Sequence, residues 1–331
     1  MLNRWRTLSL KAPLSVTWEV TGRCNFNCVH CLSTSLRDGD DELSYTEAQA
    51  FIDELAQLEV FYLNMGGGEP FLREDILDLL GYTMEKNMPV QLSTNGTLIN
   101  EETADALEKI KDLRIQVSLD GSSVAVNDQI RGSGSFKEAF NALTLLAARK
   151  IALSLNFVVM RHNFKQLDEG YRIAQNLGAT FRVSRLRPSG MARSDYENMQ
   201  LNPGQYKELY YWLQQHPHVS TGDSFFFLSA LGNPLPGINT CGAARMTCSV
   251  APNGDLYPCA FLMDGKKAGN IREHNLSFLW QNAPLFQDYR RREVGECLSC
   301  SYYGYCHGGC PAVSVFYTGR HDRRDPECLI S

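Results

Sequence analysis

The chain has 331 residues, of which 44% belong to the hydrophobic set and 21% are charged, and its formal net charge is −5. A chain of this length can bury a large core in one main domain with a smaller one beside it, and an acidic balance without a long basic run argues against nucleic acid as a partner. Residues 1–12 lack the apolar core of a signal peptide and no apolar run is long enough to span a bilayer, so we expect a cytoplasmic protein without membrane contact.

Strand-like and helix-like segments alternate from residue 13 to residue 187. The predicted strands are 14–20, 60–65, 90–93, 113–119, 151–160 and 180–185, and the predicted helices between them are 46–58, 73–86, 101–109, 136–148 and 164–177. This alternation predicts an α/β fold with a parallel sheet and right-handed crossovers. A partial (β/α)6 barrel fits it better than a flat sheet, although the spacing alone does not separate the two.

Four polar or glycine-rich motifs follow the ends of predicted strands. They occupy residues 21–31, 66–70, 93–96 and 118–121. Functional residues of parallel α/β folds gather at the carboxyl ends of the strands, so we expect these four motifs to meet on one face of the molecule.

The remaining chain predicts a connector and a small domain. Residues 188–237 are rich in Pro, Gly, Ser and aromatic residues and contain one predicted helix, 203–215. The chain is loop-rich and dense in cysteine from there on, as expected of a small domain built around metal. We therefore expect three units, at residues 13–187, 188–237 and 238–331.

The 11 cysteines lie in two groups near the ends of the chain. In a reducing compartment, clustered cysteines bind metal or take part in catalysis more often than they form disulfides. The first group, Cys24, Cys28 and Cys31, has the spacing CxxxCxxC, which can hold three corners of a [4Fe–4S] cube and leave its fourth iron open. A zinc site or buried free thiols are the alternatives for this group, and two zinc ribbons are the alternative for the later cysteines.

The CxxxCxxC motif, followed after the second strand by Gly67-Gly68-Glu69, resembles the radical S-adenosylmethionine (SAM) superfamily over residues 13–187. The resemblance implies that the open iron binds the amino and carboxylate groups of SAM, and that an electron from the cube cleaves SAM to a 5′-deoxyadenosyl radical. It also implies SAM contacts for Gly67, Gly68 and Glu69 at the amino group, Ser93 and Ser118 at the ribose, Arg131 at the carboxylate, and His30 and Leu186 near the adenine. The alternative role for Ser93 and Ser118 is capping of the strand ends, and the alternative role for Arg131 is a surface salt bridge.

The later cysteines resemble the SPASM extension of this superfamily, which carries two auxiliary [4Fe–4S] clusters. The resemblance implies one ligand set of Cys241, Cys248, Cys259 and Cys310, and a second of Cys297, Cys300, Cys306 and Cys328. The expected cofactors are therefore three [4Fe–4S] clusters and SAM. The general acid or base is not identified, since Asp120, Asp223 and Tyr317 could donate protons or relay a radical but fit structural roles equally well.

Proteins with this extension modify peptides or proteins, and segments 60–70, 185–190, 222–228 and 235–242 resemble the mycofactocin maturase family. The reaction implied is oxidative decarboxylation of the C-terminal Tyr of a precursor peptide, followed by a carbon–carbon crosslink to the preceding Val. The alternatives are a sulfatase-type maturase that forms formylglycine, another SPASM peptide-modifying enzyme, and a non-catalytic iron–sulfur electron-transfer protein. Only 23 residues precede Cys24, so we expect a separate chaperone to present the peptide, and a ferredoxin or flavodoxin to supply electrons.

Overall fold

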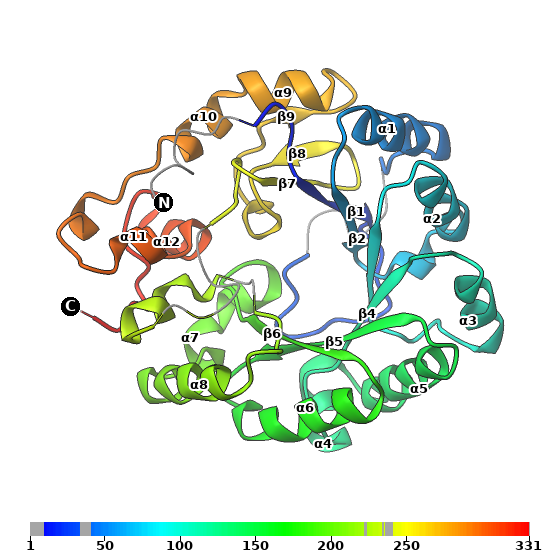
Figure 1. Cartoon of the computed structure of the whole chain (residues 1–331), viewed down its shortest axis with the longest axis horizontal. Coiled ribbons are helices and arrows are strands. Elements are labelled where there is room, and N and C mark those ends of the chain that lie inside the picture. Colours follow the sequence, from blue (N-terminus) through cyan, green and yellow to red (C-terminus); the bar gives the residue numbers. More distant parts are fainter. Residues whose placement is uncertain (1–9, 34–40, 222–223, 234, 236–240, 331) are drawn as a thin grey trace.

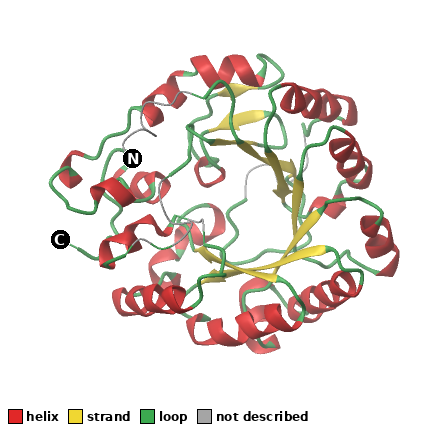
Figure 2. Cartoon of the chain, in the orientation of Figure 1, coloured by secondary structure: helices red, strands yellow, loops and turns green. Residues whose placement is uncertain are grey.

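Nine strands form one sheet in the order β6-β5-β4-β3-β2-β1-β7-β8-β9. The computed structural model describes residues 10–33, 41–221, 224–233, 235 and 241–330. The first six strands run parallel to their neighbours, and in Figures 1 and 2 they curve around a central space with helices on the outside. This arrangement confirms the predicted partial (β/α)6 barrel. Within the described ranges, no helix is both long and apolar enough to cross a membrane.

The barrel elements follow the predicted order with small shifts at their ends. The strands are β1 Ser15–Thr21, β2 Tyr62–Gly67, β3 Val90–Thr94, β4 Arg114–Ser118, β5 Ala152–Val159 and β6 Thr180–Arg185. The helices are α1 Tyr45–Gln57, α2 Ile76–Glu85, α3 Glu101–Glu108, α4 Val124–Arg131, α5 Ser135–Ala148 and α6 Leu167–Asn176, and short 3-10 turns lie at η2 Pro70–Leu72 and η3 Phe164–Gln166. Helix α4 was not predicted from the sequence.

Side chains alternate between the two faces of the barrel strands. On β1, Thr17 and Glu19 line the central cavity, whereas Val16 and Trp18 are fully buried on the opposite face. The Trp18 ring makes an edge contact with Phe51 of α1 at 5.6 Å between centroids. Because successive residues of a strand point to opposite faces, the apolar core lies between sheet and helices and the barrel interior is polar.

The connector contains the predicted helix as α8 Pro203–Gln215, preceded by the turn η4 Gly190–Ser194 and helix α7 Tyr196–Met199, and followed by η5 Phe225–Leu231. The C-terminal part adds β7 Thr247–Val250, β8 Asp255–Tyr257, η6 Ala260–Leu262, β9 Gly269–Asn270, α9 Leu276–Asn282, α10 Pro284–Arg290, η7 Gly295–Cys297, α11 Tyr303–Cys306 and α12 Pro311–Thr318. Strand β7 pairs parallel to β1, so this part extends the barrel sheet directly. The expected domain limits at residues 237, 238 and 331 lie outside the described residues, so the division into three units stays a prediction. Parts of the segments that resemble the maturase family, 222–228 and 235–242, also lie outside them.

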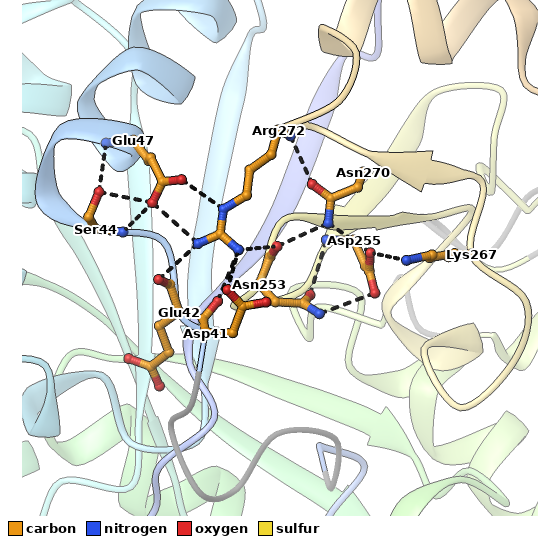
Figure 3. A network of polar contacts seen from close by, with 9 residues as sticks. All are labelled: Asp41, Glu42, Ser44, Glu47, Asn253, Asp255, Lys267, Asn270 and Arg272. Atoms are coloured by element: carbon orange, nitrogen blue, oxygen red, sulfur yellow. Dashed lines mark hydrogen bonds and ion pairs between the residues drawn. The ribbon is translucent and has the colours of Figure 1, made fainter.

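A polar network joins the first helix to the added strands (Figure 3). Arg272 Nε donates to Glu47 Oε1 at 2.7 Å, and Arg272 Nη1 donates to the backbone oxygen of Asn253 at 3.3 Å. Glu47 also closes a capping box with Ser44 at the start of α1. The neighbouring Glu42 Oε1 accepts the backbone N–H of Gly22 at 3.0 Å. The network therefore links the β8–β9 region to the segment that leads from β1 into the first cysteine motif.

A buried ion-pair cluster fastens the C-terminal segment to the end of β6. Arg185 contacts both oxygens of Asp325 at 2.8 and 2.9 Å and Glu327 Oε2 at 2.8 Å. Tyr196 and Tyr206 donate hydrogen bonds to the Glu327 carboxylate. Asp325 Oδ2 also accepts the backbone N–H of Cys310 at 3.0 Å, so the same carboxylate connects the barrel to a late cysteine.

Candidate active site

A single cavity of about 560 Å³ is lined by residues of both cysteine groups. Cys24, Cys28 and Cys31 contribute to its wall, and so do Cys241, Cys259 and Cys310. All 11 cysteines are free thiols. In the described part of the chain, no three His, Cys, Asp or Glu side chains are close enough to hold one metal ion. A volume of this size is in the range of cofactor and substrate sites.

The first cysteine motif is anchored to the end of α4. The backbone N–H of Val29 donates to Ile130 O at 3.0 Å, and Cys28 Sγ lies 3.6 Å from Arg131 O. Burial raises the pKa of the Cys28 thiol to about 11. Coordination to a metal deprotonates such a thiol, so this donor set fits an iron–sulfur cluster.

The glycines after β2 allow the backbone to pass very close to the first cysteine motif. A Cβ on Gly68 would lie 2.0 Å from Arg23 O, and one on Gly67, whose φ is +119°, would lie 2.4 Å from Thr21 O. The N–H groups of Gly68 and Glu69 donate to those same two oxygens at 2.8 Å. Only glycine permits this approach, which fixes the loop beside the cavity.

The Glu69 carboxylate is fully buried and is held by protein donors. Its oxygens accept hydrogen bonds from Thr94 Oγ1 and the Asn95 N–H, both at 2.8 Å, and from the Phe71 N–H at 3.3 Å. Burial raises its pKa to about 7 despite these bonds. Gly67 and Gly68 line the cavity while Glu69 lies behind its wall, so the predicted contact of the carboxylate with SAM stays a prediction.

Arg131 and His30 meet on one buried carboxylate. Arg131 Nε lies 2.6 Å from Asp120 Oδ2, and His30 Nε2 lies 3.0 Å from the same oxygen. The other oxygen, Oδ1, accepts the Val158 N–H at 2.6 Å. Although burial opposes it, the Arg131 guanidinium and the contact with His30 lower the pKa of Asp120. Asp120 thus positions Arg131 and His30, two residues predicted to contact SAM. From the sequence, a structural role and a role as proton donor were both open for Asp120.

The other predicted SAM residues also line the cavity. Ser93 and Ser118 lie at the ends of β3 and β4, and Leu186 follows β6 with 3% of its surface exposed. Ser93 Oγ accepts a hydrogen bond from Gln116 Nε2 at 3.2 Å. Of the other candidates for proton or radical transfer, Tyr317 lies 37% exposed outside the cavity wall, and Asp223 lies outside the described residues.

The later cysteines differ in whether they reach the cavity. Cys241, Cys259 and Cys310 share the cavity wall, whereas Cys248 lies in the apolar core and does not reach the cavity. Burial raises the pKa of Cys297 to about 11, and the Cys306 and Cys328 thiols add to the shift. Burial likewise raises the pKa of Cys306, and the Cys328 and Cys300 thiols add to this shift, so these thiols are neighbours. Their role as one ligand set stays a prediction.

The cavity wall also carries charged residues that were not singled out from the sequence, among them Glu19 and Arg187. Glu19 is 3% exposed, its Oε2 accepts a hydrogen bond from Ser33 Oγ at 3.0 Å, and burial raises its pKa to about 7. The Arg187 guanidinium lies 3.1 Å from the centre of the Phe261 ring. The sequence did contain a signal for Glu19. It is an acidic residue among apolar residues of the first strand, and the alternation of side chains along a strand places its position on the inner face.

Comparisons with known proteins agree with this geometry. Residues 18–172 match the family model of the radical SAM superfamily, and residues 241–310 match that of the SPASM iron–sulfur cluster-binding domain. The chain is 44% identical to "Mycofactocin maturase MftC" of Mycobacterium ulcerans (strain Agy99), over 97% of this chain and 89% of the relative. It is 31% identical to "AdoMet-dependent heme synthase" of Methanosarcina barkeri (strain Fusaro / DSM 804), over 96% of this chain and 97% of that protein.

A solved structure of similar fold is Streptococcus suis SuiB bound to the precursor peptide SuiA. Its TM-score is 0.81 at 19% sequence identity, with 99% of this chain and 78% of that chain covered. At this identity the likeness concerns the fold, which in both proteins continues from the barrel into the C-terminal part.

Proposed function

The chain belongs to the radical SAM enzymes with a SPASM domain, and from its relationship to the mycofactocin maturases we propose that it modifies the C-terminus of a ribosomally made precursor peptide. It is a radical SAM oxidoreductase that uses iron–sulfur clusters and SAM. The proposed reaction decarboxylates a C-terminal Tyr oxidatively and then joins this residue to the preceding Val by a carbon–carbon bond. The observation that carries the proposal is the alignment with the maturase along nearly the whole chain.

The residues around the first cysteine trio fit the cofactors of this family. We propose that Cys24, Cys28 and Cys31 hold the SAM-cleaving cluster and that Arg131, fixed by Asp120, binds the SAM carboxylate. When bound, SAM and the cluster supply a carbon-centred radical that abstracts hydrogen. The backbone of Gly67 and Gly68 together with Glu69 would receive the amino group. The Ser93 and Ser118 hydroxyls would receive the ribose, and His30 and Leu186 would border the adenine.

The cavity also offers groups for the end of a peptide. In the proposed first step the peptide carboxylate gives up carbon dioxide, one hydrogen atom to the SAM-derived radical, and one electron that an iron–sulfur cluster would accept, which leaves a carbon–carbon double bond. We propose that Arg187 meets the substrate carboxylate, since a guanidinium binds a carboxylate well. Glu19, with its pKa raised to about 7 by burial, can stay protonated near neutral pH and so avoid repelling that carboxylate.

The test is an anaerobic reaction followed by mass spectrometry. The reconstituted enzyme is incubated with dithionite, SAM, a peptide ending in Val-Tyr and its chaperone. A peptide that loses the elements of formic acid supports the proposal. The matched control is the same peptide with a C-terminal amide, which has no carboxyl group to lose and should stay unchanged.

The result also decides between the proposal and its alternatives. A formylglycine-forming maturase would oxidise an internal Cys or Ser and leave the C-terminus intact, so the mass change would map elsewhere. If 5′-deoxyadenosine forms but no peptide ending in Val-Tyr changes, the Val-Tyr proposal fails and another SPASM substrate must be sought. The family membership removes the alternative of a non-catalytic electron-transfer protein.

The remaining partners stay proposals that the same reaction can examine. A separate peptide-binding chaperone is expected to tighten peptide binding relative to the enzyme alone, and equal binding without it would contradict its role. A ferredoxin or flavodoxin should replace dithionite as the electron donor. The count of three clusters predicts that iron and sulfide analysis accounts for all three cysteine groups, and a cytoplasmic location stays a prediction.

A further inference from the structure

Ser224 carries a buried hydroxyl that the described part of the chain does not use. The residue lines the cavity, and only 3% of its surface is exposed. Its Oγ has no hydrogen-bond partner among the residues that the structure describes. A buried hydroxyl without a partner is costly, so buried polar side chains are normally hydrogen-bonded. Ser224 therefore offers a donor and an acceptor to a molecule bound in the cavity.

The local backbone does not explain why a serine occupies this position. Ser224 has a φ of 60° and a ψ of 8°, in the left-handed region that glycine adopts without strain. It precedes the 3-10 helix η5, yet within the described chain its side chain forms no capping hydrogen bond. A glycine would suit the backbone better, and a capping serine would use its hydroxyl. Strained residues cluster at functional sites, so this hydroxyl is a candidate binding group.

Arg185 fixes the backbone of Ser224. Its Nη1 donates a hydrogen bond to Ser224 O at 2.8 Å, and its guanidinium lies 4.6 Å from the ring centre of Phe227. Phe227 in turn makes an edge contact with Tyr206 at 5.0 Å between ring centres. Since Arg185 is itself paired with Asp325, a buried cluster holds this part of the wall. A side chain held in this way is preorganised for a ligand, which limits the entropy lost on binding.

An aromatic side chain close to Ser224 in the sequence shares the cavity wall with it. Phe226 lines the cavity and is 7% exposed, whereas Phe225 and Phe227 are fully buried in the apolar core. This part of the wall therefore combines an aromatic ring with a hydroxyl. A phenol needs both kinds of contact, because its ring packs against aromatic groups and its hydroxyl needs a hydrogen-bond partner when it is buried.

The position of Ser224 also fits the group that is proposed to meet the substrate carboxylate. Arg187 follows Arg185 after one intervening residue, so the two Cα atoms are at most about 7 Å apart. Both arginines line the cavity, and Arg185 is bonded to Ser224 O. A C-terminal Tyr carries its carboxylate and its phenol at opposite ends of one residue. Neighbouring sites for an anion and for a hydroxyl can therefore receive both ends at once.

We propose that Ser224 binds the phenol hydroxyl of the C-terminal Tyr and that Phe226 packs against its ring, so that this pair selects Tyr over Phe. A site that hydrogen-bonds a substrate hydroxyl rejects the analogue without it, because the polar group of the site is then left unpaired. The inference rests on the proposed function, whose substrate it takes, and adds the residue that determines specificity. It can fail while the proposed reaction stands.

The experiment compares precursor peptides that end in Val-Tyr and in Val-Phe. Their dissociation constants are measured anaerobically with SAM and the chaperone but without reductant, so that no radical forms and the reactivity of the two side chains does not enter. The variants are Ser224→Ala, which keeps the strained backbone, and Ser224→Gly, which relieves it, and both remove the hydroxyl. Ser229→Ala is the matched control, since Ser229 is a fully buried serine of the same 3-10 helix that lies outside the described cavity wall.

The unchanged enzyme is expected to bind the Tyr peptide more tightly than the Phe peptide. Both Ser224 variants should reduce this preference by about 5- to 10-fold, the loss expected for one hydrogen bond, and Ser229→Ala should keep it. Equal binding of the two peptides by the unchanged enzyme would overturn the inference. An unaltered preference in both Ser224 variants would do the same, and so would a reduction in Ser224→Ala alone, which would assign the effect to backbone strain.

The proposed function is examined separately with reductant added. If the unchanged enzyme does not decarboxylate the Val-Tyr peptide, the proposed function fails and the inference fails with it. If decarboxylation occurs but the Ser224 variants keep the preference for Tyr in the binding measurement, only the inference fails.

Discussion

Arg131→Lys should weaken SAM binding without removing the SAM-cleaving cluster. Arg131 contacts Asp120 through Nε at 2.6 Å. Its two Nη groups can therefore receive the SAM carboxylate as a bidentate pair while Nε stays on Asp120. Lysine offers a point charge, so it can satisfy either Asp120 or SAM but lacks the planar fork that serves both.

The size of the effect follows from the contact that is lost. A hydrogen bond to a charged group contributes about 1.5–3 kcal/mol. One such bond lost corresponds to an increase of about 10- to 150-fold in the SAM dissociation constant. Asp120→Asn should act in the same direction, because the carboxylate that holds Arg131 and His30 loses its charge. Since these two residues act through one unit, the double variant should lose less than the sum of the single losses.

The assay is a SAM titration of the reduced enzyme, followed by the change in the EPR signal of the SAM-cleaving cluster. Iron content shows that the variants are loaded, and the exposed Arg172→Lys is the matched control for an Arg-to-Lys change at the surface. If Arg131→Lys binds SAM as tightly as Arg172→Lys at equal iron content, Arg131 does not contact the SAM carboxylate. Additive losses in the double variant would show that Asp120 does not act through Arg131.

Three further predictions concern the site and its support. Gly68→Ala should lose iron and SAM binding, because its Cβ would lie 2.0 Å from the backbone oxygen of Arg23, and an alanine variant with unchanged iron content would contradict this close approach. Burial raises the Glu19 pKa to about 7 from 4.5, so between these values the folded state binds more protons than the unfolded state and stability falls as pH rises. Urea unfolding from about pH 5 to 7 should therefore show a smaller dependence of stability on pH in Glu19→Gln than in the unchanged protein, and an equal dependence would refute the assignment. Arg185→Met leaves the buried Asp325 carboxylate without its cation and should cost about 3–5 kcal/mol in urea unfolding, whereas a loss under about 1 kcal/mol would show that the pair is dispensable.

The barrel could be predicted from the sequence because its signals are local. Helical spacing of apolar residues in α1 and a Ser44–Glu47 capping box mark one helix, and glycine-rich turns mark the ends of strands. The convergence of the four motifs followed from one topological rule, since parallel strands share a carboxyl edge. The cofactor-binding class followed from cysteine spacing, which the family comparisons confirm.

The features that the sequence did not predict depend on contacts between distant segments. Strand β7 pairs with β1, which lies more than two hundred positions earlier in the chain. The local sequence pattern of β7 does not indicate which strand it pairs with. The role of Asp120 depends on Arg131 and His30 reaching it from different elements. Helix α4 has only 8 residues of mixed composition, so its sequence does not show a recognisable helical spacing of apolar residues.

Cys248 shows that cysteine spacing and strand geometry give different information about a residue. The eight late cysteines can be divided into two groups of four, so their number alone favours two cluster-binding sites with four cysteine ligands each. The structure adds the face of the strand that each residue occupies, and in β7 the inward positions belong to Thr247 and Ser249. The role of Cys248 as a cluster ligand stays a prediction. The same alternation gives the whole barrel a polar interior, unlike barrels whose interior is packed with branched apolar side chains. Because the apolar core lies outside the strands, the interior is left for cofactor and substrate.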